Sequence, residues 1–375
     1  MCIAIEYNCF TFLNKSIKIA PIFLKGLPMR ALPVIQMRSI QMKIASISGL
    51  FLAGTIIVLV SFSVYSTGRT QSYVTGETKA LSIEYVQRLL ANVATTQANK
   101  IKSQLNVAID AARTMAQTFS VLADQQDANT PAELRRDQLN AVLRHVLETN
   151  PSLNGTYSAW EPNALDGNDA NFAGRADKGS DATGRFLPYW SRGGNGSIAM
   201  EPLTGYDDHG TNAQGLTNGE WYIVPQTSGA ENIMGPLSYV EQGTTVFLAT
   251  VSVPIKINDK FHGITGANFK ITAVQDLVRN VASALFGGKA KVVIVNETGL
   301  VVANSVDPAT IGKKIADTNP HWAETVATVG SKDSLVQDNA ESQSIDAFAP
   351  FEVGRTGTPW FVIVSVPRDV ALAEA

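Results

Sequence analysis

Aromatic side chains gather in one stretch of the sequence, in a pattern that suits a recess for a small molecule. They stand among glycines, prolines and polar residues between positions 155 and 240: Trp160, Phe186, Tyr189, Trp190, Tyr206, Trp221, Tyr222 and Tyr239. A solid core would favour Leu, Ile and Val. Because Trp and Tyr combine a broad apolar face with a polar tip, we expect a ligand pocket here, with about half of the rings plugging a sheet.

Catalytic and metal-binding signatures do not emerge from the polar residues. The sequence has no G-x-S-x-G elbow, no Walker A loop, no G-x-G-x-x-G before a helix and no H-E-x-x-H pair. The run Asp166-Gly167-Asn168-Asp169 resembles the start of a calcium loop, but Ala170 and Asn171 stand where a ligand and the turn glycine belong. Four scattered histidines and two cysteines offer no metal cluster. We therefore expect no enzyme activity, no metal and no cofactor.

Composition excludes other classes of protein. The chain has 375 residues, which suits two or three units, and it is 45% hydrophobic and 17% charged, which argues against disorder. A net charge of -3 gives no basic field, so we expect no nucleic-acid partner.

The run Ile44–Val64 carries no charge and predicts a helix that crosses the lipid bilayer, because about 20 apolar residues span its core. A cleaved signal peptide is the alternative, but its apolar region is usually only about 7–15 residues long, and no A-x-A site follows. Basic residues precede the run: Lys15, Lys18, Lys25, Arg30, Arg38 and Lys43. This predicts a cytoplasmic N-terminus in a bacterial inner membrane and a periplasmic remainder, residues 67–375. Both cysteines, Cys2 and Cys9, fall in the tail 1–42, which is either a poorly ordered segment or an over-extended gene start.

Beyond the membrane segment the patterns predict an α+β fold. Apolar residues at spacings of three and four, without Gly or Pro, indicate one long helix from about Ala80 to Ala123. A second helix should run to about Thr149, with Thr130 and Glu133 as a capping box. Short strands and helices then alternate, with hairpin turns predicted at Asn258-Asp259-Lys260 and Glu297-Thr298-Gly299. The predicted strands are Thr156–Trp160, Arg185–Trp190, Thr244–Ile257, Phe261–Phe269, Lys291–Val295, Leu300–Asn304, Ser344–Ala349 and Trp360–Val366. The predicted helices are Thr272–Leu285 and Pro320–Val329. Hairpins predict two modules with antiparallel sheets.

An anchor, a long helix and two such modules resemble the double Cache sensor domain of bacterial chemoreceptors. Local sequences along residues 43–375 agree with that family: Gly184-Arg185-Phe186-Leu187-Pro188-Tyr189-Trp190-Ser191-Arg192, Glu201-Pro202-Leu203, Tyr206-Asp207, Glu220-Trp221-Tyr222, Pro236-Leu237-Ser238-Tyr239, Val253-Pro254-Ile255, Lys260-Phe261-His262-Gly263-Ile264-Thr265-Gly266-Ala267-Asn268, Glu297-Thr298-Gly299-Leu300-Val301-Val302-Ala303 and Ile311-Gly312-Lys313. The resemblance implies PAS-like modules, a ligand in the larger, membrane-distal one, and a homodimer through the long helix. We expect these segments: tail 1–42, transmembrane helix 43–66, spine helix 67–130, distal module 131–286, proximal module 287–367 and the start of a return helix, 368–375.

The sequence departs from the amino-acid-sensing members of that family at two positions. Gly219 stands where those members have an Arg for the ligand carboxylate, and Asn268 where they have an Asp for the ammonium. We therefore expect a small amine, a betaine-like compound or another polar metabolite, held through cation–π contacts. The predicted site comprises Tyr189, Trp190, Asp207, Trp221, Tyr222, Tyr239 and Asn268.

Three functions remain open at this point. We favour the sensor region of a chemotaxis receptor that signals across the membrane. The same ectodomain would also suit a histidine kinase or a diguanylate cyclase, or an anchored periplasmic binding protein without output. The residues that follow Ala375 in the gene would separate them.

Overall fold

The computed structural model describes residues 39–124, 131–330 and 334–373, and it divides the chain into two units, 1–74 and 75–375. Helix α1 (Ile40–Ala123) begins in the first unit and ends in the second. Its segment Ile40–Gln71 is apolar and long enough to cross a membrane, and none of it is buried by other parts of the protein. The uncharged run predicted from the sequence lies inside this segment.

In the second unit, α1 packs along one stripe of buried residues. Val86, Leu90, Ala94, Ala98 and Ile101 are all at most 1% exposed, and their spacing of three to four residues follows the turn of the helix. The long helix predicted from about Ala80 to Ala123 is confirmed, but it is continuous with the apolar segment before it.

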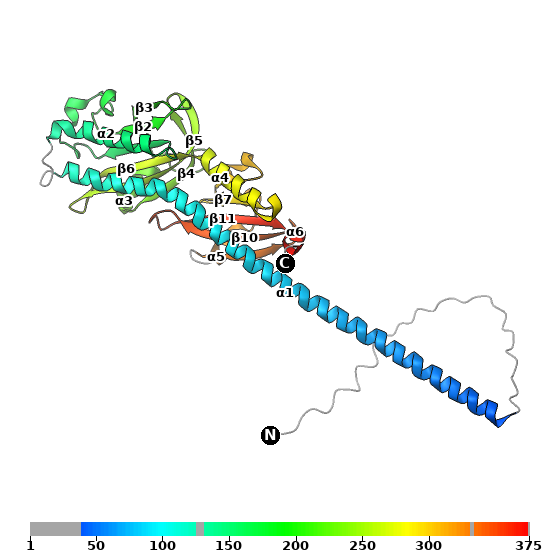
Figure 1. The fold of residues 1–375 in the computed structure, drawn as a ribbon. Helices are drawn as coiled ribbons and strands as arrows, with labels where there is room; N and C mark the ends of the chain where they lie inside the picture. Colours follow the sequence, from blue (N-terminus) through cyan, green and yellow to red (C-terminus); the bar gives the residue numbers. More distant parts are fainter. Residues whose placement is uncertain (1–38, 125–130, 331–333, 374–375) are drawn as a thin grey trace, which may run out of the picture. The chain divides into compact units, whose positions relative to one another are not determined.

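The first module is built on a six-stranded antiparallel sheet in the order β3-β2-β1-β6-β5-β4 (Figure 1). Its strands are β1 (Gly155–Trp160), β2 (Pro188–Arg192), β3 (Ile198–Pro202), β4 (Asn232–Glu241), β5 (Thr244–Ile257) and β6 (Lys260–Lys270). Helices α1 and α2 (Ala132–Thr149) cover one face, where Thr156 donates a hydrogen bond to the Leu143 carbonyl of α2. Helix α3 (Glu220–Ser228) covers the other face, against Tyr157. Successive residues of β1 therefore point into two different cores.

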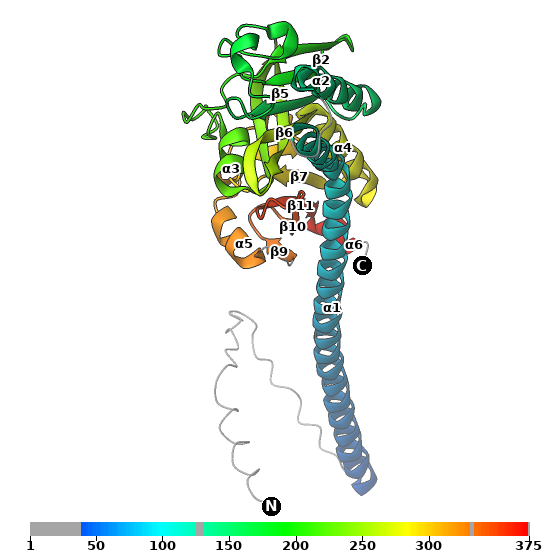
Figure 2. The same ribbon diagram turned by 90° about the vertical axis from the view of Figure 1, so that its left-hand side faces the viewer.

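The second module holds a five-stranded antiparallel sheet in the order β8-β7-β11-β10-β9 (Figure 2). After α4 (Ile271–Ala284) come β7 (Lys291–Val295), β8 (Val301–Asn304), α5 (Trp322–Val329), β9 (Leu335–Asn339), β10 (Ser344–Glu352), β11 (Pro359–Pro367) and α6 (Arg368–Ala373). Short 3-10 helices are η1 (Asp169–Phe172), η2 (Ala176–Lys178), η3 (Phe286–Gly288), η4 (Pro308–Thr310) and η5 (Ile315–Asp317). One sheet face joins the core around α1 and α4, and the other packs against Trp322 of α5.

The predicted α+β fold with a long N-terminal helix and two antiparallel sheets is confirmed. At the predicted β5–β6 turn, Asn258 and Asp259 both have positive φ, which is the geometry of a tight two-residue hairpin. Four elements were missed by the sequence reasoning: α3, β3, β4 and β9. In the predicted capping box, Thr130 and the side chain of Glu133 lie outside the described residues, and the module limits at 131–286 and 287–367 stay predictions.

Candidate ligand-binding site

A small cavity lies in the first module, on the face of the six-stranded sheet that α3 covers. Its lining residues come from five strands, from α3 and from the loop after β3: Tyr157, Tyr189, Leu203, Trp221, Leu237, Tyr239, Leu248, Thr250 and Asn268. Its volume is about 20 Å³, which is room for about one water molecule. The aromatic rings nearly fill the recess in this conformation.

Edge-to-face ring pairs build the walls of this cavity. Tyr157 of β1 meets Trp221 with ring centroids 5.6 Å apart, and Tyr189 of β2 meets Tyr239 of β4 at the same distance. Tyr189 can lie close to β1 because residue 155 is a glycine. A Cβ at Gly155 would stand 2.6 Å from the Tyr189 ring, closer than any real contact. The absence of a side chain at Gly155 on β1 therefore allows the ring of Tyr189 to occupy this position.

Four of the seven predicted site residues line the cavity: Tyr189, Trp221, Tyr239 and Asn268. Trp190 does not, because consecutive residues of a strand point to opposite faces. Its indole donates a hydrogen bond to the Asn140 Oδ1 on α2, at 3.0 Å. Asp207 also lies outside the lining, in an exposed turn after β3. The prediction placed Tyr189 and Trp190 in one strand but did not separate the two faces of that strand. The pleat of β2 fixes the direction of Trp190, and the turn after β3 holds Asp207 outside the lining.

Tyr222, the remaining predicted residue, adjoins the cavity core but is engaged elsewhere. Its hydroxyl donates to the Glu161 carboxylate and accepts from Arg185. The Arg185 guanidinium lies 4.3 Å from the ring centroid of Tyr206 and 5.1 Å from that of Tyr222. The guanidinium of Arg185 therefore occupies the ring faces of Tyr206 and Tyr222, two of the aromatic residues from which a ligand pocket was predicted.

A buried carboxylate that the sequence reasoning missed stands behind Tyr189. Glu241, at the end of β4, is 3% exposed, and it forms no ion pair with any of the described residues. Its partners are neutral: Asn154 Nδ2 donates to its two oxygens at 2.7 and 2.6 Å, and the Tyr189 hydroxyl donates to Oε1. Glu241 follows Leu237 and Tyr239 at intervals of two, so strand alternation could have predicted its direction.

Asn268 adds a second acceptor to this corner of the site. Its Nδ2 donates to the Tyr189 hydroxyl at 3.0 Å, while its Oδ1 is buried without a hydrogen-bond partner among the described residues. Burial, together with the nearby Glu241 carboxylate, holds the pKa of Tyr189 well above its ordinary value, so the phenol stays protonated and donates. The corner therefore carries one negative charge and an unused acceptor. This arrangement favours a ligand that brings positive charge and N–H donors.

The structure also explains why no arginine occupies position 219. Gly219 precedes α3, and a Cβ there would lie 2.9 Å from the carbonyl oxygens of both Gly205 and Tyr206. The loop after β3 crosses directly over this residue. A side chain at position 219 would displace that loop, so the departure from the amino-acid-sensing pattern is built into the backbone.

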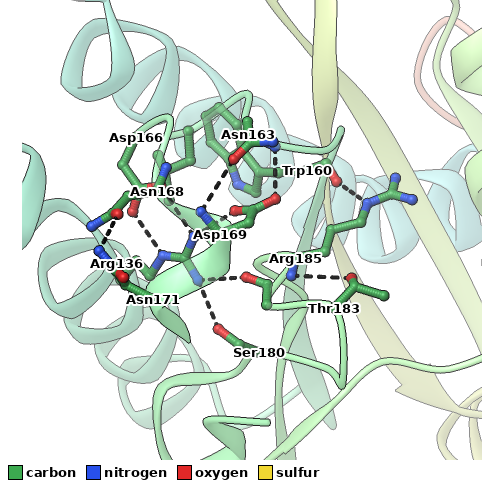
Figure 3. Close-up of polar contacts among 12 residues, drawn as sticks. Arg136, Trp160, Asn163, Asp166, Asn168, Asp169, Asn171, Ser180, Thr183 and Arg185 are labelled. Carbon is green, nitrogen blue, oxygen red and sulfur yellow. Dashed lines mark hydrogen bonds and ion pairs between the residues drawn. The ribbon is translucent and has the colours of Figure 1, made fainter. Parts of the chain in front are cut away.

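Two carboxylates of the calcium-like segment, Asp166 and Asp169, pair with an arginine. Arg136 of α2 is buried, and it reaches Asp166 at 2.7 Å and Asp169 at 2.6 Å (Figure 3). It also donates to Ser180 Oγ and to the Gly184 carbonyl, each at 2.8 Å. These contacts fix the segment between β1 and β2 against α2. Among the described residues, no group of three or more His, Cys, Asp and Glu could hold a metal ion.

Two antiparallel-sheet modules on one long helix, with an aromatic-lined cavity in the first, define a ligand-binding sensor domain. The family model dCache_1, described as "Cache domain", matches residues 78–375. The chain belongs to this family, which confirms the resemblance drawn from the sequence.

Relatives agree with this assignment. The methyl-accepting chemotaxis protein TlpQ of Pseudomonas aeruginosa is 27% identical over 342 residues, which cover 90% of this chain and 48% of that protein. The chain thus spans about half the length of this relative. The fold is also similar to a structure described as methyl-accepting chemotaxis protein X, with a TM-score of 0.59 and 21% identity, covering 75% of this chain and 98% of the other. The extracellular domain of the putative histidine kinase mmHK1S-Z2 gives a TM-score of 0.58 and 22% identity, covering 78% and 99%.

Proposed function

We propose that the chain is the extracytoplasmic sensor region of a chemotaxis receptor, anchored by the apolar part of α1 with its N-terminus in the cytoplasm. Its first module binds a small cationic metabolite, either an amine or a betaine-like compound. The similarity to a chemotaxis protein, 27% identity over 90% of this chain, supports the receptor class. The departures at Gly219 and Asn268 argue against an α-amino acid bound in the way the resemblance implies.

The buried Glu241 carboxylate is the observation that carries the ligand class. A buried charge without a counter-charge is costly, and a bound cation would remove this cost. Glu241 reaches the cavity through the Tyr189 hydroxyl, and Asn268 Oδ1 offers a free acceptor next to it. The rings of Tyr157, Tyr189, Trp221 and Tyr239 around them give a cation–π surface worth about 0.5–2 kcal/mol for each contact.

Binding requires this recess to open, because about 20 Å³ admits no metabolite. A ligand that prefers the open form shifts the population toward it. The wall that moves is α3, which carries Trp221 and covers the cavity from outside the sheet. Helix α3 also carries Glu220; the pKa of Glu297 in the second module is raised mainly by burial and, to a smaller extent, by the charge of Glu220. A shift of α3 would therefore reach the second module and, through it, the return helix.

Calorimetric titration of the full chain in detergent micelles tests this function. We expect ethylammonium or glycine betaine to bind, and Glu241→Gln to weaken binding about tenfold or more, since hydrogen bonds and charges at this position contribute about 1.5–3 kcal/mol. Trp221→Ala should abolish binding. The matched control is Glu148→Gln, an exposed glutamate on α2 outside the cavity lining, which should leave affinity unchanged. If only carboxylates or sugars bind, or if Glu241→Gln has no effect, the proposal is wrong.

A homodimer through α1 is part of this proposal. Exposed apolar residues lie on one side of α1: Leu81, Tyr85, Val107 and Val121. Their intervals of 4, 22 and 14 residues place all four within an arc of about 80° around the helix. In a background without Cys2 and Cys9, a Val121→Cys variant should form a disulfide-linked dimer in membranes. A His145→Cys variant on the exposed side of α2 serves as the control, and equal cross-linking of the two would contradict the dimer.

An ectodomain of a sensor kinase is the alternative. The fold similarity to the histidine kinase ectodomain supports the fold alone and does not separate the two outputs. Translation of the gene beyond Ala375 decides between them: chemoreceptor heptads support the proposal, and a kinase or cyclase motif overturns it.

A further inference from the structure

The second module contains a cavity with a volume of about 940 Å³, far larger than the cavity of about 20 Å³ in the first module. Its lining residues come from one face of the five-stranded sheet and from the segment of η5 and α5. This volume is at the upper end of the range for small-molecule sites, which is about 300–1,000 Å³.

A row of polar side chains crosses the sheet inside this cavity. Four residues pair in register on adjacent strands and all line the cavity: Lys291 of β7, Ser365 of β11, Asp346 of β10 and Gln337 of β9. A parallel row of apolar residues lies two positions away on the same strands. It contains Val293 of β7, Ile363 of β11 and Phe348 of β10, which also line the cavity. The sheet thus presents an ordered polar strip beside an apolar floor.

The charges of the polar row form no ion pair among the described residues, whereas two nearby pairs of side chains contact each other. His321 contacts Glu324 at 3.2 Å, and Asp338 contacts Arg368 at 2.9 Å. Asp346 is 9% exposed, and its donors among the described residues are Ser344 Oγ at 2.8 Å and Asn339 Nδ2 at 3.4 Å. Within the described residues, neither Asp346 nor the half-buried Lys291 forms an ion pair.

From this juxtaposition we infer that the second module is a separate binding site for a dipeptide-sized zwitterion. Its ammonium group binds Asp346 and its carboxylate binds Lys291. β7 and β10 lie on either side of β11, so their backbones are about 9.5 Å apart. An extended dipeptide spans about 7 Å, and the flexible Lys291 stem covers the difference. The α-groups of a single amino acid lie closer together and would leave a wider gap for the Lys291 stem to cover. The ligand's side chains rest on the floor of Val293, Ile363 and Phe348.

The position of this site gives it a direct route to the return helix. Val366 and Pro367 line the cavity and immediately precede α6, and Asp338 of the lining pairs with Arg368, the first residue of α6. A ligand at this position contacts the segment from which α6 starts. The inference is independent of the amine proposed for the first module.

Calorimetric titration of the full chain in micelles with glycylglycine tests the site. We expect saturable binding that weakens about tenfold or more in Asp346→Asn and in Lys291→Gln. N-acetyl-glycylglycine and glycylglycine amide, which each lack one charge, should bind less tightly by a similar factor. Asp276→Asn on α4, outside the cavity lining (side chain 69% exposed), and Glu241→Gln in the first module are the controls, and both should bind as the unmodified chain does.

A chemical readout covers the case in which Asp346→Asn fails to fold. With Cys2 and Cys9 replaced by serine, Ser365→Cys places the only thiol of the chain in the middle of the polar row. Its alkylation by N-ethylmaleimide should slow about tenfold at about ten times the dissociation constant of glycylglycine. The inference is overturned if glycylglycine gives no saturable heat up to about 10 mM, if the thiol is not protected, or if Glu241→Gln removes the binding.

Discussion

Replacement of Arg136 by methionine should destabilise the first module strongly, because Arg136 forms ion pairs with two carboxylates in its interior. The guanidinium binds Asp166 at 2.7 and 3.1 Å and Asp169 at 2.6 Å, and its side chain is 1% exposed. It also stacks on the Phe172 ring at 3.9 Å. Methionine keeps the apolar stem but leaves both carboxylates without their cation.

The size of the effect follows from this burial. Removal of one partner from a buried ion pair costs about 3–5 kcal/mol, because the remaining charge stays desolvated. For a unit of this size, about 2–4 °C of Tm corresponds to each kcal/mol, so the Tm should fall by roughly 6–20 °C. The matched control lies on the same helix. Arg144 pairs with Glu148 at 2.7 Å, but its side chain is 57% exposed, so Arg144→Met should cost at most about 1 kcal/mol.

Thermal unfolding followed by tryptophan fluorescence measures both variants in the full chain, and the first cooperative transition is the one to compare. A third variant adds Asp166→Asn and Asp169→Asn to Arg136→Met and should recover part of the loss, since it removes the uncompensated charges. Equal Tm shifts in Arg136→Met and Arg144→Met would refute the reasoning. A triple variant no more stable than Arg136→Met would show that packing, and not charge, causes the loss.

Three further predictions concern backbone space and buried acids. Gly219→Ala should lower the free energy of unfolding, measured by chemical denaturation, by about 1–3 kcal/mol, because the new Cβ meets two carbonyl oxygens at 2.9 Å. The control, Gly194→Ala, has open space around it and should change the free energy of unfolding by less than about 0.5 kcal/mol. Asn268→Asp adds a second acid beside the buried Glu241 corner, so the variant should lose Tm as the pH rises from about 5 to 8, and a pH-independent difference would contradict this. Burial raises the pKa of Glu297 from 4.5 to about 7; the native state then binds the extra proton, so stability should fall as the pH rises through this window. Glu297→Gln should flatten that slope in Tm measured against pH, and an unchanged slope would exclude Glu297 as its source.

Some elements could be predicted because their signals are local. The uncharged run 44–64, the stripe of α1 and the Asn258-Asp259 turn each depend on residues near one another in the chain. Helix α3 was missed because it contains Pro225 and mixes aromatic with polar residues. β4 was missed because Gly235 and Pro236 interrupt it.

The sequence alone determined the class of fold, the apolar helix and the aromatic character of the first module. Only the tertiary structure decided which groups meet there. Tyr189 and Trp190 are neighbours in the chain, yet the pleat of β2 sends one to the cavity and the other to α2. Glu241 is 87 residues from Asn154, and it is a buried, cation-free carboxylate only because strand pairing brings these segments together. Burial and charge pairing depend on contacts between distant segments, which local patterns of residues do not encode.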